Sequence, residues 1–542
     1  MSGLIDILSA PKSLTNFWLN YKKMQEINAT GYKLDAVTRL SMFGHEDAGQ
    51  EKAERLKQYF VKKTDYETVT SDVPLSIVIG FKGVGKSATL KVAYEEDRES
   101  NSPAMWIRPD DVSELYNQIN AEENTLNLIT LWKKGIARLV ACKIAEDWTI
   151  TASSDAEHVL TWAESSGYKS KDLISQLASR FTAVIKGDSE ISVKDIREKD
   201  SESLGEHHIL KRISEKKTIR IYIDDLDRGW EATELDKKRL AALIYALGDL
   251  TSDIEGFQAR ISLRTDVYSL IRSTKEFTDK FESAEVWCIW NNANILKALI
   301  KRIYSHFKIE VQESDFANKS QAEIAKLLQP IFKLNFENTK SWSGKPTYRV
   351  LMSLIRRRPR DLVKLVSMAA KYAHEDGRNV VTGDDFCEIM DDYSSGRMTD
   401  IINEFSSEMN KIGDLLYNMG PTVEEIKKKQ ERRYTYSTQE LYDKIKNATS
   451  NVSQVRLANA RATDHHDIAQ FLYKIGFVTG RKDLPNKIDR VYFEQKKQLL
   501  GRQVGDKGYS WEIHPAYRSA LFVKTKNDSN WESTVDTSQD ED

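Results

Sequence analysis

Cysteine, proline and long hydrophobic runs are all scarce in this sequence of 542 residues. The three cysteines, Cys142, Cys288 and Cys387, lie far apart without Cys-x-x-Cys spacing. This excludes a disulfide framework or a zinc ribbon and favours buried thiols in a reducing compartment. No apolar run approaches the about 20 residues that a membrane-spanning helix needs, and the opening MSGLIDILSAPKSL has no basic segment of a signal peptide. We therefore expect a cytoplasmic protein with no membrane partner.

An excess of charge of one sign is also absent. The chain has 80 Lys and Arg residues against 82 Asp and Glu residues, which gives a formal net charge of −2. A polycation is excluded, so any nucleic-acid binding requires a local basic patch. With only 10 Pro and 25 Gly, a helix-rich chain is expected. At roughly 150 residues per domain, the length predicts a multidomain protein.

Short apolar runs indicate the strands of one sheet. Five of them have the continuous hydrophobic character of strands that are covered on both faces, and helical patterns separate them. They are residues 74–79, 104–107, 219–223, 260–263 and 286–289. The predicted fold class is therefore α/β, with a parallel-sheet core, a large helical insertion, a helical lid and a C-terminal winged-helix-like module.

Shifts in composition and periodicity suggest the domain boundaries. The expected order is an N-terminal helical segment (1–40), the parallel-sheet core (41–108 and 216–290), a helical insertion (109–215), a helical lid (291–395), a helical connector (396–436), the winged-helix-like module (437–524) and a disordered acidic tail (525–542). The tail is polar and has no apolar periodicity.

The strongest motif is the glycine-rich run from Gly80 to Ser87, GFKGVGKS, which fits G-x-x-x-x-G-K-[ST]. It follows a predicted strand and precedes a helical pattern, as a phosphate-binding loop requires. Glycines let backbone N–H groups turn toward the β-phosphate, Lys86 is expected to reach the β/γ oxygens, and the Ser87 hydroxyl is expected to bind Mg²⁺. The parallel-sheet core is therefore predicted to be a P-loop NTPase core, with ATP and Mg²⁺ as the expected cofactors.

A second motif places acids at the end of a strand. The apolar run Ile221 to Ile223 leads directly into Asp224 and Asp225, the pattern of a Walker B strand. Ligands of open α/β sheets bind at the carboxyl ends of the strands, so Asp224 is predicted to hold Mg²⁺ through its waters. Asp225 is predicted to orient or deprotonate the attacking water. Lys86, Asp224 and Asp225 are thus the expected catalytic residues.

The run IYIDDLDR, residues 221–228, resembles the signature of the KAP-type P-loop NTPases, within the wider STAND and AAA+ assemblage. Phe43-Gly44 resembles the segment that wraps the adenine in AAA+ proteins. The run 262–266, which includes Arg264, lies where such proteins carry a polar sensor of the γ-phosphate. The run RRRPRDL, residues 356–362, resembles the arginine-bearing second sensor of origin-recognition-like ATPases, which makes Arg360 a lid contact to the γ-phosphate.

Together, the motifs and the resemblance give one set of expected nucleotide-binding residues. They are Phe43, Gly44, Gly80, Lys82, Gly83, Val84, Gly85, Lys86, Ser87, Ala88, Arg264 and Arg360. The run 356–360 is also compatible with a plain basic helix start. Arg228, Arg264 and Arg272 are all candidates for an arginine finger, and the sequence does not choose among them.

Two departures limit the resemblance. KAP-type proteins often carry membrane helices within the NTPase domain, and this chain has none. Position 225 is Asp where many AAA+ proteins have Glu, which leaves open slow hydrolysis or a nucleotide-locked scaffold.

The C-terminal module raises the question of DNA binding. Its expected recognition helix opens at residues 463–467 with two acids and no Arg or Lys. The following polar loop, from Arg481 to Arg502, is basic enough to contact phosphates as a wing; its other basic residues are Lys482, Lys487, Arg490, Lys496 and Lys497. DNA contact and protein contact or packing both remain open.

The overall prediction is a Mg²⁺-dependent ATPase whose nucleotide state drives conformational change or oligomerisation and controls a separate effector protein. The resemblance implies a prokaryotic, defence-related setting. The alternatives are a DNA-binding ATPase that uses the winged helix, and a nucleotide-locked scaffold with little turnover.

Overall fold

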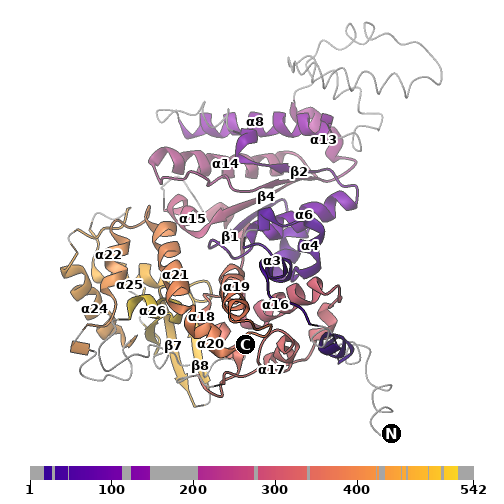
Figure 1. The fold of residues 1–542 in the computed structure, drawn as a ribbon. Coiled ribbons are helices and arrows are strands. Elements are labelled where there is room, and N and C mark those ends of the chain that lie inside the picture. The colour runs from indigo at the N-terminus through magenta and orange to yellow at the C-terminus, as the bar shows by residue number, and fades with distance from the viewer. Residues whose placement is uncertain are drawn as a thin grey trace, which may run out of the picture. The chain divides into compact units, whose positions relative to one another are not determined.

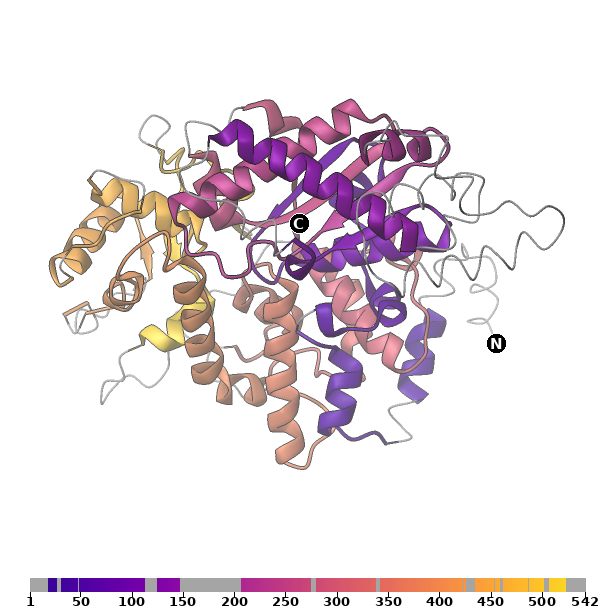
Figure 2. The same cartoon turned by 90° about the horizontal axis from the view of Figure 1, so that it is seen from above.

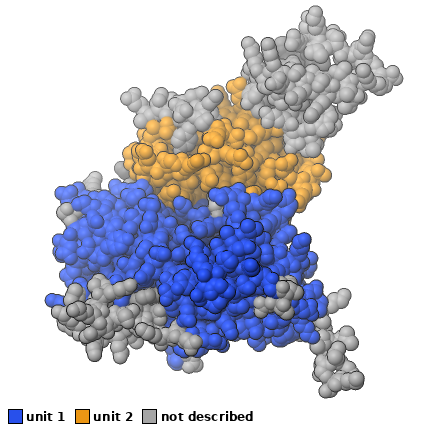
Figure 3. Space-filling model, viewed as in Figure 1, with its two compact units in different colours: residues 1–62, 81–88, 288–542 blue, residues 63–80, 89–287 orange. Residues whose placement is uncertain are grey.

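The structure is a computed structural model, and its ribbon is shown in Figure 1. It describes residues 18–26, 31–46, 48–112, 124–146, 206–273, 279–337, 342–422, 424–425, 434–452, 454–458, 462–485, 487–501 and 506–522. The chain divides into two compact units, coloured separately in Figure 3. Unit 1 comprises residues 1–62, 81–88 and 288–542, and unit 2 comprises residues 63–80 and 89–287.

Unit 2 contains a five-stranded parallel sheet, which confirms the predicted α/β fold class. Its strands are β1 (Leu75–Gly80), β2 (Ala104–Ile107), β3 (Ile219–Ile223), β4 (Phe257–Arg264) and β5 (Glu285–Trp287). The spatial order is β2-β3-β4-β1-β5, so β4 lies between the strand that leads into the glycine-rich loop and the strand that leads into the two acids. Because the strands are parallel, all their carboxyl ends lie at one edge of the sheet.

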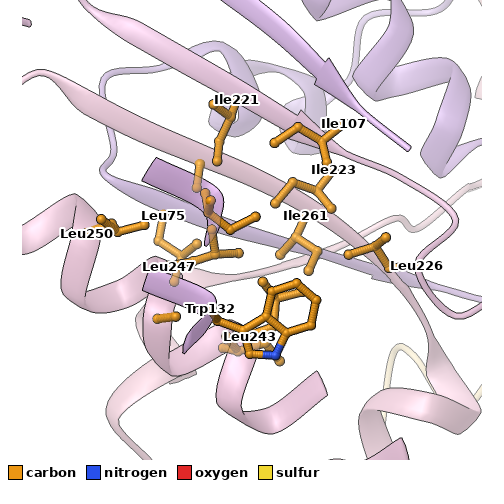
Figure 4. Close-up of a cluster of buried hydrophobic side chains, with 14 of the residues drawn as sticks. Leu75, Ile107, Trp132, Ile221, Ile223, Leu226, Leu243, Leu247, Leu250 and Ile261 are labelled. Carbon is orange, nitrogen blue, oxygen red and sulfur yellow. The ribbon is translucent and has the colours of Figure 1, made fainter. Parts of the chain in front are cut away.

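One face of the sheet carries a large hydrophobic cluster, part of which is drawn in Figure 4. Alternate strand residues such as Ile221, Ile223 and Ile261 point into it, and they meet Leu243 and Leu247 of α14 (Glu234–Asp253). Residues of period two on a strand share a face, while the i, i+3, i+4 residues of a helix share a stripe, so the two patterns can interdigitate. This packing stabilises the sheet that positions the acids.

Helix α8 (Thr125–Glu146) belongs to the same cluster, which changes the interpretation of the insertion. Trp132 is fully buried and its indole N–H donates to the Arg239 carbonyl at 3.1 Å. Figure 2 shows α8 crossing the sheet region as a long helix, and α8 packs against α14. The start of the predicted insertion 109–215 is therefore part of the core, and residues 113–123 and 147–205 lie outside the described residues.

The opposite face of the sheet is covered by α6 (Lys86–Glu99). Tyr222 lies between Ile221 and Ile223 on β3 and so points away from the hydrophobic cluster. Its ring packs on Trp106 of β2, at 6.2 Å between centroids, and edge-on to Tyr94 of α6 at 5.8 Å. The Tyr222 hydroxyl donates to Asp97 at 2.6 Å, which satisfies its polar end.

Shorter helices complete the described part of unit 2. They are α5 (Thr64–Thr70), α13 (Glu206–Ser214), α15 (Thr265–Arg272) and the 3-10 helices Pro109–Val112 and Asp279–Ala284. Across the described residues of both units, no helix is both long and apolar enough to cross a membrane.

Unit 1 is mainly helical. Its helices before residue 420 are a helix at 18–26, α3 (Ala36–Phe43), α4 (Ala53–Tyr59), α16 (Asn292–His306), α17 (Gln321–Ala325), α18 (Thr347–Leu354), α19 (Pro359–Glu375), α20 (Gly383–Glu388), α21 (Met390–Phe405) and α22 (Ile412–Asn418), with 3-10 helices at Ala48–Gln50, Glu313–Phe316 and Lys326–Leu328. The boundary predicted at residue 395 falls inside α21, because the helical pattern continues across it.

The C-terminal part of unit 1 combines helices with an antiparallel sheet. Its elements are β6 (Thr435–Tyr436), α24 (Thr438–Ser450), α25 (His465–Lys474), β7 (Val478–Leu484), β8 (Lys487–Val491), β9 (Ser510–Ile513) and α26 (Pro515–Leu521), with sheet order β6-β9-β7-β8. Two helices followed by a hairpin are typical of a winged helix. Much of the predicted polar loop is this β7–β8 hairpin, and the tail 525–542 and Arg502 lie outside the described residues.

Candidate nucleotide-binding site

The glycine-rich loop links β1 to α6 in the arrangement expected of a phosphate-binding loop. β1 ends at Gly80 and α6 begins at Lys86. Gly83 and Gly85 have φ values of 87° and 93°, which residues with a Cβ rarely adopt. Ser87 lies in the first turn of α6, where N–H groups have no helical partner and the helix dipole favours an anion. The loop can therefore turn its backbone toward a phosphate.

The predicted lid residue Arg360 packs directly against this loop. Its N–H donates to the Gly83 carbonyl at 3.3 Å, and a Cβ added at Gly83 would lie 2.9 Å from the Arg360 Cβ. The Arg360 Nε also donates to the Glu46 carbonyl at 3.1 Å. Unit 1 thus brings together the loop, the first turn of α19 and the segment next to Phe43-Gly44.

The Phe43-Gly44 segment is more enclosed than the resemblance implies. The Phe43 ring is fully buried and packs near Phe332, and its carbonyl accepts a hydrogen bond from Arg302. Gly44 ends α3 with φ 78°, and a Cβ there would lie 2.8 Å from Glu51 Oε2. The Phe43 side chain is therefore a core residue, so an adenine contact at this segment, which stays a prediction, would use its backbone.

A cluster of charged and aromatic groups supports that segment. The His45 N–H donates to Glu51 Oε2 at 3.1 Å, and the Tyr59 hydroxyl donates to the same oxygen at 3.2 Å. The Arg302 guanidinium lies 4.0 Å from the Tyr59 ring centroid. Burial raises the pKa of Tyr59 to about 12, so this hydroxyl remains a donor at neutral pH.

In unit 2, Asp224 follows β3 at the carboxyl edge of the sheet. It is 6% exposed, and the Ser262 hydroxyl of β4 donates to its Oδ1. Asp225 is exposed and has φ 59°, a left-handed conformation that Asp tolerates better than most residues. The chain turns sharply here, which separates the two acids into one buried and one exposed carboxylate.

Arg264, predicted to contact the γ-phosphate, is held by carboxylates at the end of β4. Its Nε donates to Asp266 Oδ1 at 3.0 Å, and Nη2 pairs with the other oxygen of the same residue. Its backbone N–H donates to Asp227 Oδ2 at 3.2 Å. Gly80 is the sheet neighbour of Arg264, so the residue is at the expected edge. The Arg264 guanidinium is, however, paired with Asp266. The β4 side chain that contacts Asp224 is Ser262.

Each unit contains an oxygen donor of the kind that Mg²⁺ binds. In unit 1, Ser87 has a hydroxyl oxygen in the first turn of α6, and in unit 2 the Asp224 carboxylate accepts the Ser262 hydroxyl at Oδ1. Mg²⁺ prefers oxygen ligands and usually keeps several waters. Among the described residues, no group of three or more His, Cys, Asp and Glu side chains gathers as an all-protein metal site.

Residues that the sequence did not indicate hold the loop through hydrogen bonds to its backbone. The backbone N–H of Lys82, a predicted nucleotide-binding residue, donates to Glu404 Oε1 at 2.8 Å. The indole N–H of Trp290 donates to the Val84 carbonyl at 2.7 Å. Lys86 Nζ donates to the Phe81 carbonyl at 3.3 Å, so its side chain folds over the loop. Glu404 lies 322 positions from Lys82, so no local pattern could have connected them.

Fewer basic side chains of the predicted wing are exposed than the sequence indicates. Arg490 and Arg481 are buried at 3% and 7% exposure, and both pair with the fully buried Glu512, together with Arg518. These two arginines neutralise an internal carboxylate and are not available to phosphates. Among the described residues of the predicted wing, Lys482, Lys496 and Lys497 are the exposed basic side chains.

The sheet order and the loop between β1 and α6 define a P-loop NTPase fold. Residues 297–402, from α16 to α21, match the family model described as the FunZ-associated C-terminal helical domain. Over 548 residues the chain is 21% identical to the 80.3 kDa protein of Escherichia coli (strain K12) that is named after transposon gamma-delta, covering 94% of this chain and 72% of that protein.

Similar solved structures are nucleotide-binding proteins of archaea. The ORC2 protein of Aeropyrum pernix in ADPNP–ADP complexes aligns with 86% of this chain and 91% of its own, at 11% identity and a TM-score of 0.36. A Walker-type ATPase of Pyrococcus abyssi aligns with 75% of this chain and 93% of its own, at 12% identity and a TM-score of 0.29. The KAP subtype stays a prediction.

Proposed function

We propose that the chain is a Mg²⁺-dependent ATPase whose nucleotide state sets its conformation or assembly. The observation that carries the proposal is the loop 80–87, with left-handed Gly83 and Gly85 between a parallel strand and a helix. The carboxylate of Asp224 leaves the sheet at the same edge as the strand that leads into the loop. This combination serves the phosphates and the metal of a nucleoside triphosphate.

Each residue has a distinct role in the proposal. Lys86 neutralises the β/γ-phosphates, and Ser87 and Asp224 hold Mg²⁺, which supplies neutralisation of the charge that develops on the phosphates. Ser262 orients the Asp224 carboxylate by donating to its Oδ1. Asp225, exposed and held in a left-handed turn, orients the attacking water.

Arg360 is the proposed lid contact. It already touches the loop through Gly83, and its guanidinium can offer two parallel donors to phosphate oxygens. To shift the ratio of closed to open lid from 1:99 to 99:1, ATP must bind the closed state about 5.5 kcal/mol more tightly than the open state. Charge-assisted contacts to the γ-phosphate can supply a large part of this difference. Lid closure on ATP would then promote a homo-oligomer or expose a changed surface to an effector protein. The KAP resemblance implies a defence-related setting for that effector.

The test of hydrolysis is phosphate release by the full chain with Mg²⁺ and ATP. Asp225→Asn should lower the turnover by about 10²-fold or more, the size of a general-base effect, while ATP affinity stays within a few-fold. Unchanged phosphate release in Asp225→Asn would contradict the assigned role and favour the nucleotide-locked scaffold.

A DNA-binding ATPase remains the second candidate. Exposed Lys482, Lys496 and Lys497 on or next to the hairpin favour it, as does the transposon name of the E. coli relative. The burial of Arg481 and Arg490 on Glu512 reduces the charge available for phosphate contacts. The ATPase proposal does not depend on the outcome.

A further inference from the structure

A carboxylate from the end of α21 is bonded to the nucleotide loop. Glu404 Oε1 accepts the Lys82 N–H at 2.8 Å, and Glu404 Oε2 accepts Arg358 Nη1 at 3.0 Å. Glu404 belongs to the last turn of α21, and Arg358 is the N-cap residue of α19. Two helices distant in sequence thus meet at one peptide group of the loop.

Arg358 holds the same peptide from its other side. Its Nη1 also donates to the Lys82 carbonyl at 3.4 Å, and its guanidinium lies 4.5 Å from the Phe81 ring centroid. Phe405, the neighbour of Glu404, packs edge-on against Phe81 at 6.1 Å between centroids. The backbone N–H and carbonyl of Lys82 are therefore held by the Arg358–Glu404 ion pair. The Phe81 ring is held by Arg358 and Phe405.

The Arg358–Glu404 ion pair is buried, and its carboxylate is ionised. The side chains of Arg358 and Glu404 are 4% and 2% exposed. Burial would raise the pKa of Glu404, but the Arg358 charge and the Lys82 N–H outweigh it and lower that pKa, so the carboxylate is ionised at neutral pH. An ionised carboxylate makes a stronger hydrogen bond to a backbone N–H than a neutral acceptor does.

We propose that Glu404 and Arg358 are positioning residues that hold residues 81–85 in the phosphate-binding conformation before nucleotide arrives. The inference rests on the proposed ATPase function. A loop with two left-handed glycines has many alternative conformations, so fixing it is entropically costly. If only a fraction of molecules has a competent loop, the apparent dissociation constant rises in inverse proportion to that fraction. The pair acts through the loop and does not touch the reacting phosphate.

The chain offers a matched control in Glu408. This glutamate lies four residues after Glu404, is 5% exposed, and pairs with Lys474 at 2.5 Å. Removing either carboxylate breaks an ion pair whose carboxylate is buried, so both variants should be less stable. We expect Glu404→Ala to raise the KM for ATP by about tenfold with kcat within twofold, because lost preorganisation weakens ground-state and transition-state binding equally. Glu408→Ala should leave KM unchanged.

Glu404→Gln provides the conservative variant. Its amide oxygen can still accept the Lys82 N–H but cannot neutralise Arg358, so its KM should lie between those of the wild type and Glu404→Ala. A role limited to global stability would instead lower the active fraction, and hence the apparent kcat, in all three variants with KM unchanged. That pattern would overturn the proposal.

Hydrogen exchange of the nucleotide-free full chain separates this inference from the proposed function. Peptides that cover residues 81–88 should exchange about tenfold faster in Glu404→Ala than in the wild type and in Glu408→Ala. Equal exchange in the two variants would refute the positioning role. If exchange is faster in Glu404→Ala but the wild type does not bind ATP, the positioning role of Glu404 stands and the ATPase proposal is refuted.

Discussion

The buried carboxylate of Asp361 allows a sharp test of how the arginine-rich run 356–360 is held. Asp361 is 1% exposed and accepts Arg356 Nε at 2.6 Å, Arg356 Nη2 at 2.9 Å and Arg397 Nη1 at 2.5 Å. Asp361→Asn keeps the shape but leaves two guanidinium groups, 5% and 1% exposed, without their shared counter-charge. Removing one partner of a buried ion pair costs about 3–5 kcal/mol, and because Arg397 keeps its pair with Asp400 at 3.0 Å, the expectation lies in the lower half of that range.

The measurement is the local unfolding free energy of α19 and α21 from native-state hydrogen exchange, because a chain of two units need not unfold in one step. Asp376→Asn is the control, since Asp376 pairs with Arg378 at 2.9 Å but is 65% exposed, and exposed pairs contribute about 0–1 kcal/mol. A loss below about 1 kcal/mol in Asp361→Asn, equal to the control, would refute the reasoning.

The same network gives a pH dependence of known sign. Burial would raise the pKa of Asp361, but the charges of Arg356 and Arg397 hold it well below its usual range. A depressed folded-state pKa contributes stability that is complete above the unfolded value of about 3.9 and is lost as the pH falls toward the folded value. Asp361→Asn should therefore weaken the acid sensitivity of α19 below about pH 4, whereas equal acid sensitivity in both proteins would contradict the assignment.

Two further predictions concern the loop and the hairpin. Gly83→Ala should lower the local unfolding free energy by about 1–3 kcal/mol more than Gly85→Ala. Both glycines have positive φ, but a Cβ at Gly83 would lie 2.9 Å from the Arg360 Cβ, whereas a Cβ at Gly85 would lie 3.9 Å from the Ala88 Cβ. Native-state hydrogen exchange of residues 81–88 in both variants checks this, and equal losses would contradict the Arg360 contact. Lys496→Glu combined with Lys497→Glu should leave ATP affinity within twofold of wild type. A salt-sensitive duplex DNA affinity that this double variant abolishes would instead establish the DNA-binding candidate.

The strands were predictable because each is a short apolar run that carries its own signal. Strand β2, residues 104–107, and strand β3, residues 219–223, begin and end as expected. The loop glycines were also readable, since a phosphate-binding loop needs residues without a Cβ at fixed spacing. By contrast, periodicity shows that α8 has an apolar face but not what covers that face, so its place in the sheet core could not be foreseen.

Long-range charge pairing was the main gap. Arg490 looks like any exposed basic residue in the sequence, and only the fold shows that Glu512 neutralises it in the interior. Glu404 belongs to no sequence motif, because the group that it binds is the backbone N–H of Lys82, 322 positions earlier in the chain. Arg264 stands at the expected edge of the sheet, but Asp266, two residues later, engages its guanidinium. Local patterns identify which residues can bind phosphate, and partners elsewhere decide which of them are available.

Titration calorimetry of the full chain with Mg²⁺ and ATP, in the wild type and in Lys86→Ala, tests the central claim most directly. The account predicts one ATP per chain for the wild type and a loss of about 10²-fold or more in affinity for Lys86→Ala, because the lysine supplies a charge-assisted contact to the β/γ-phosphates. Absence of heat with ATP in the folded wild-type chain, or equal affinity in Lys86→Ala, would contradict it.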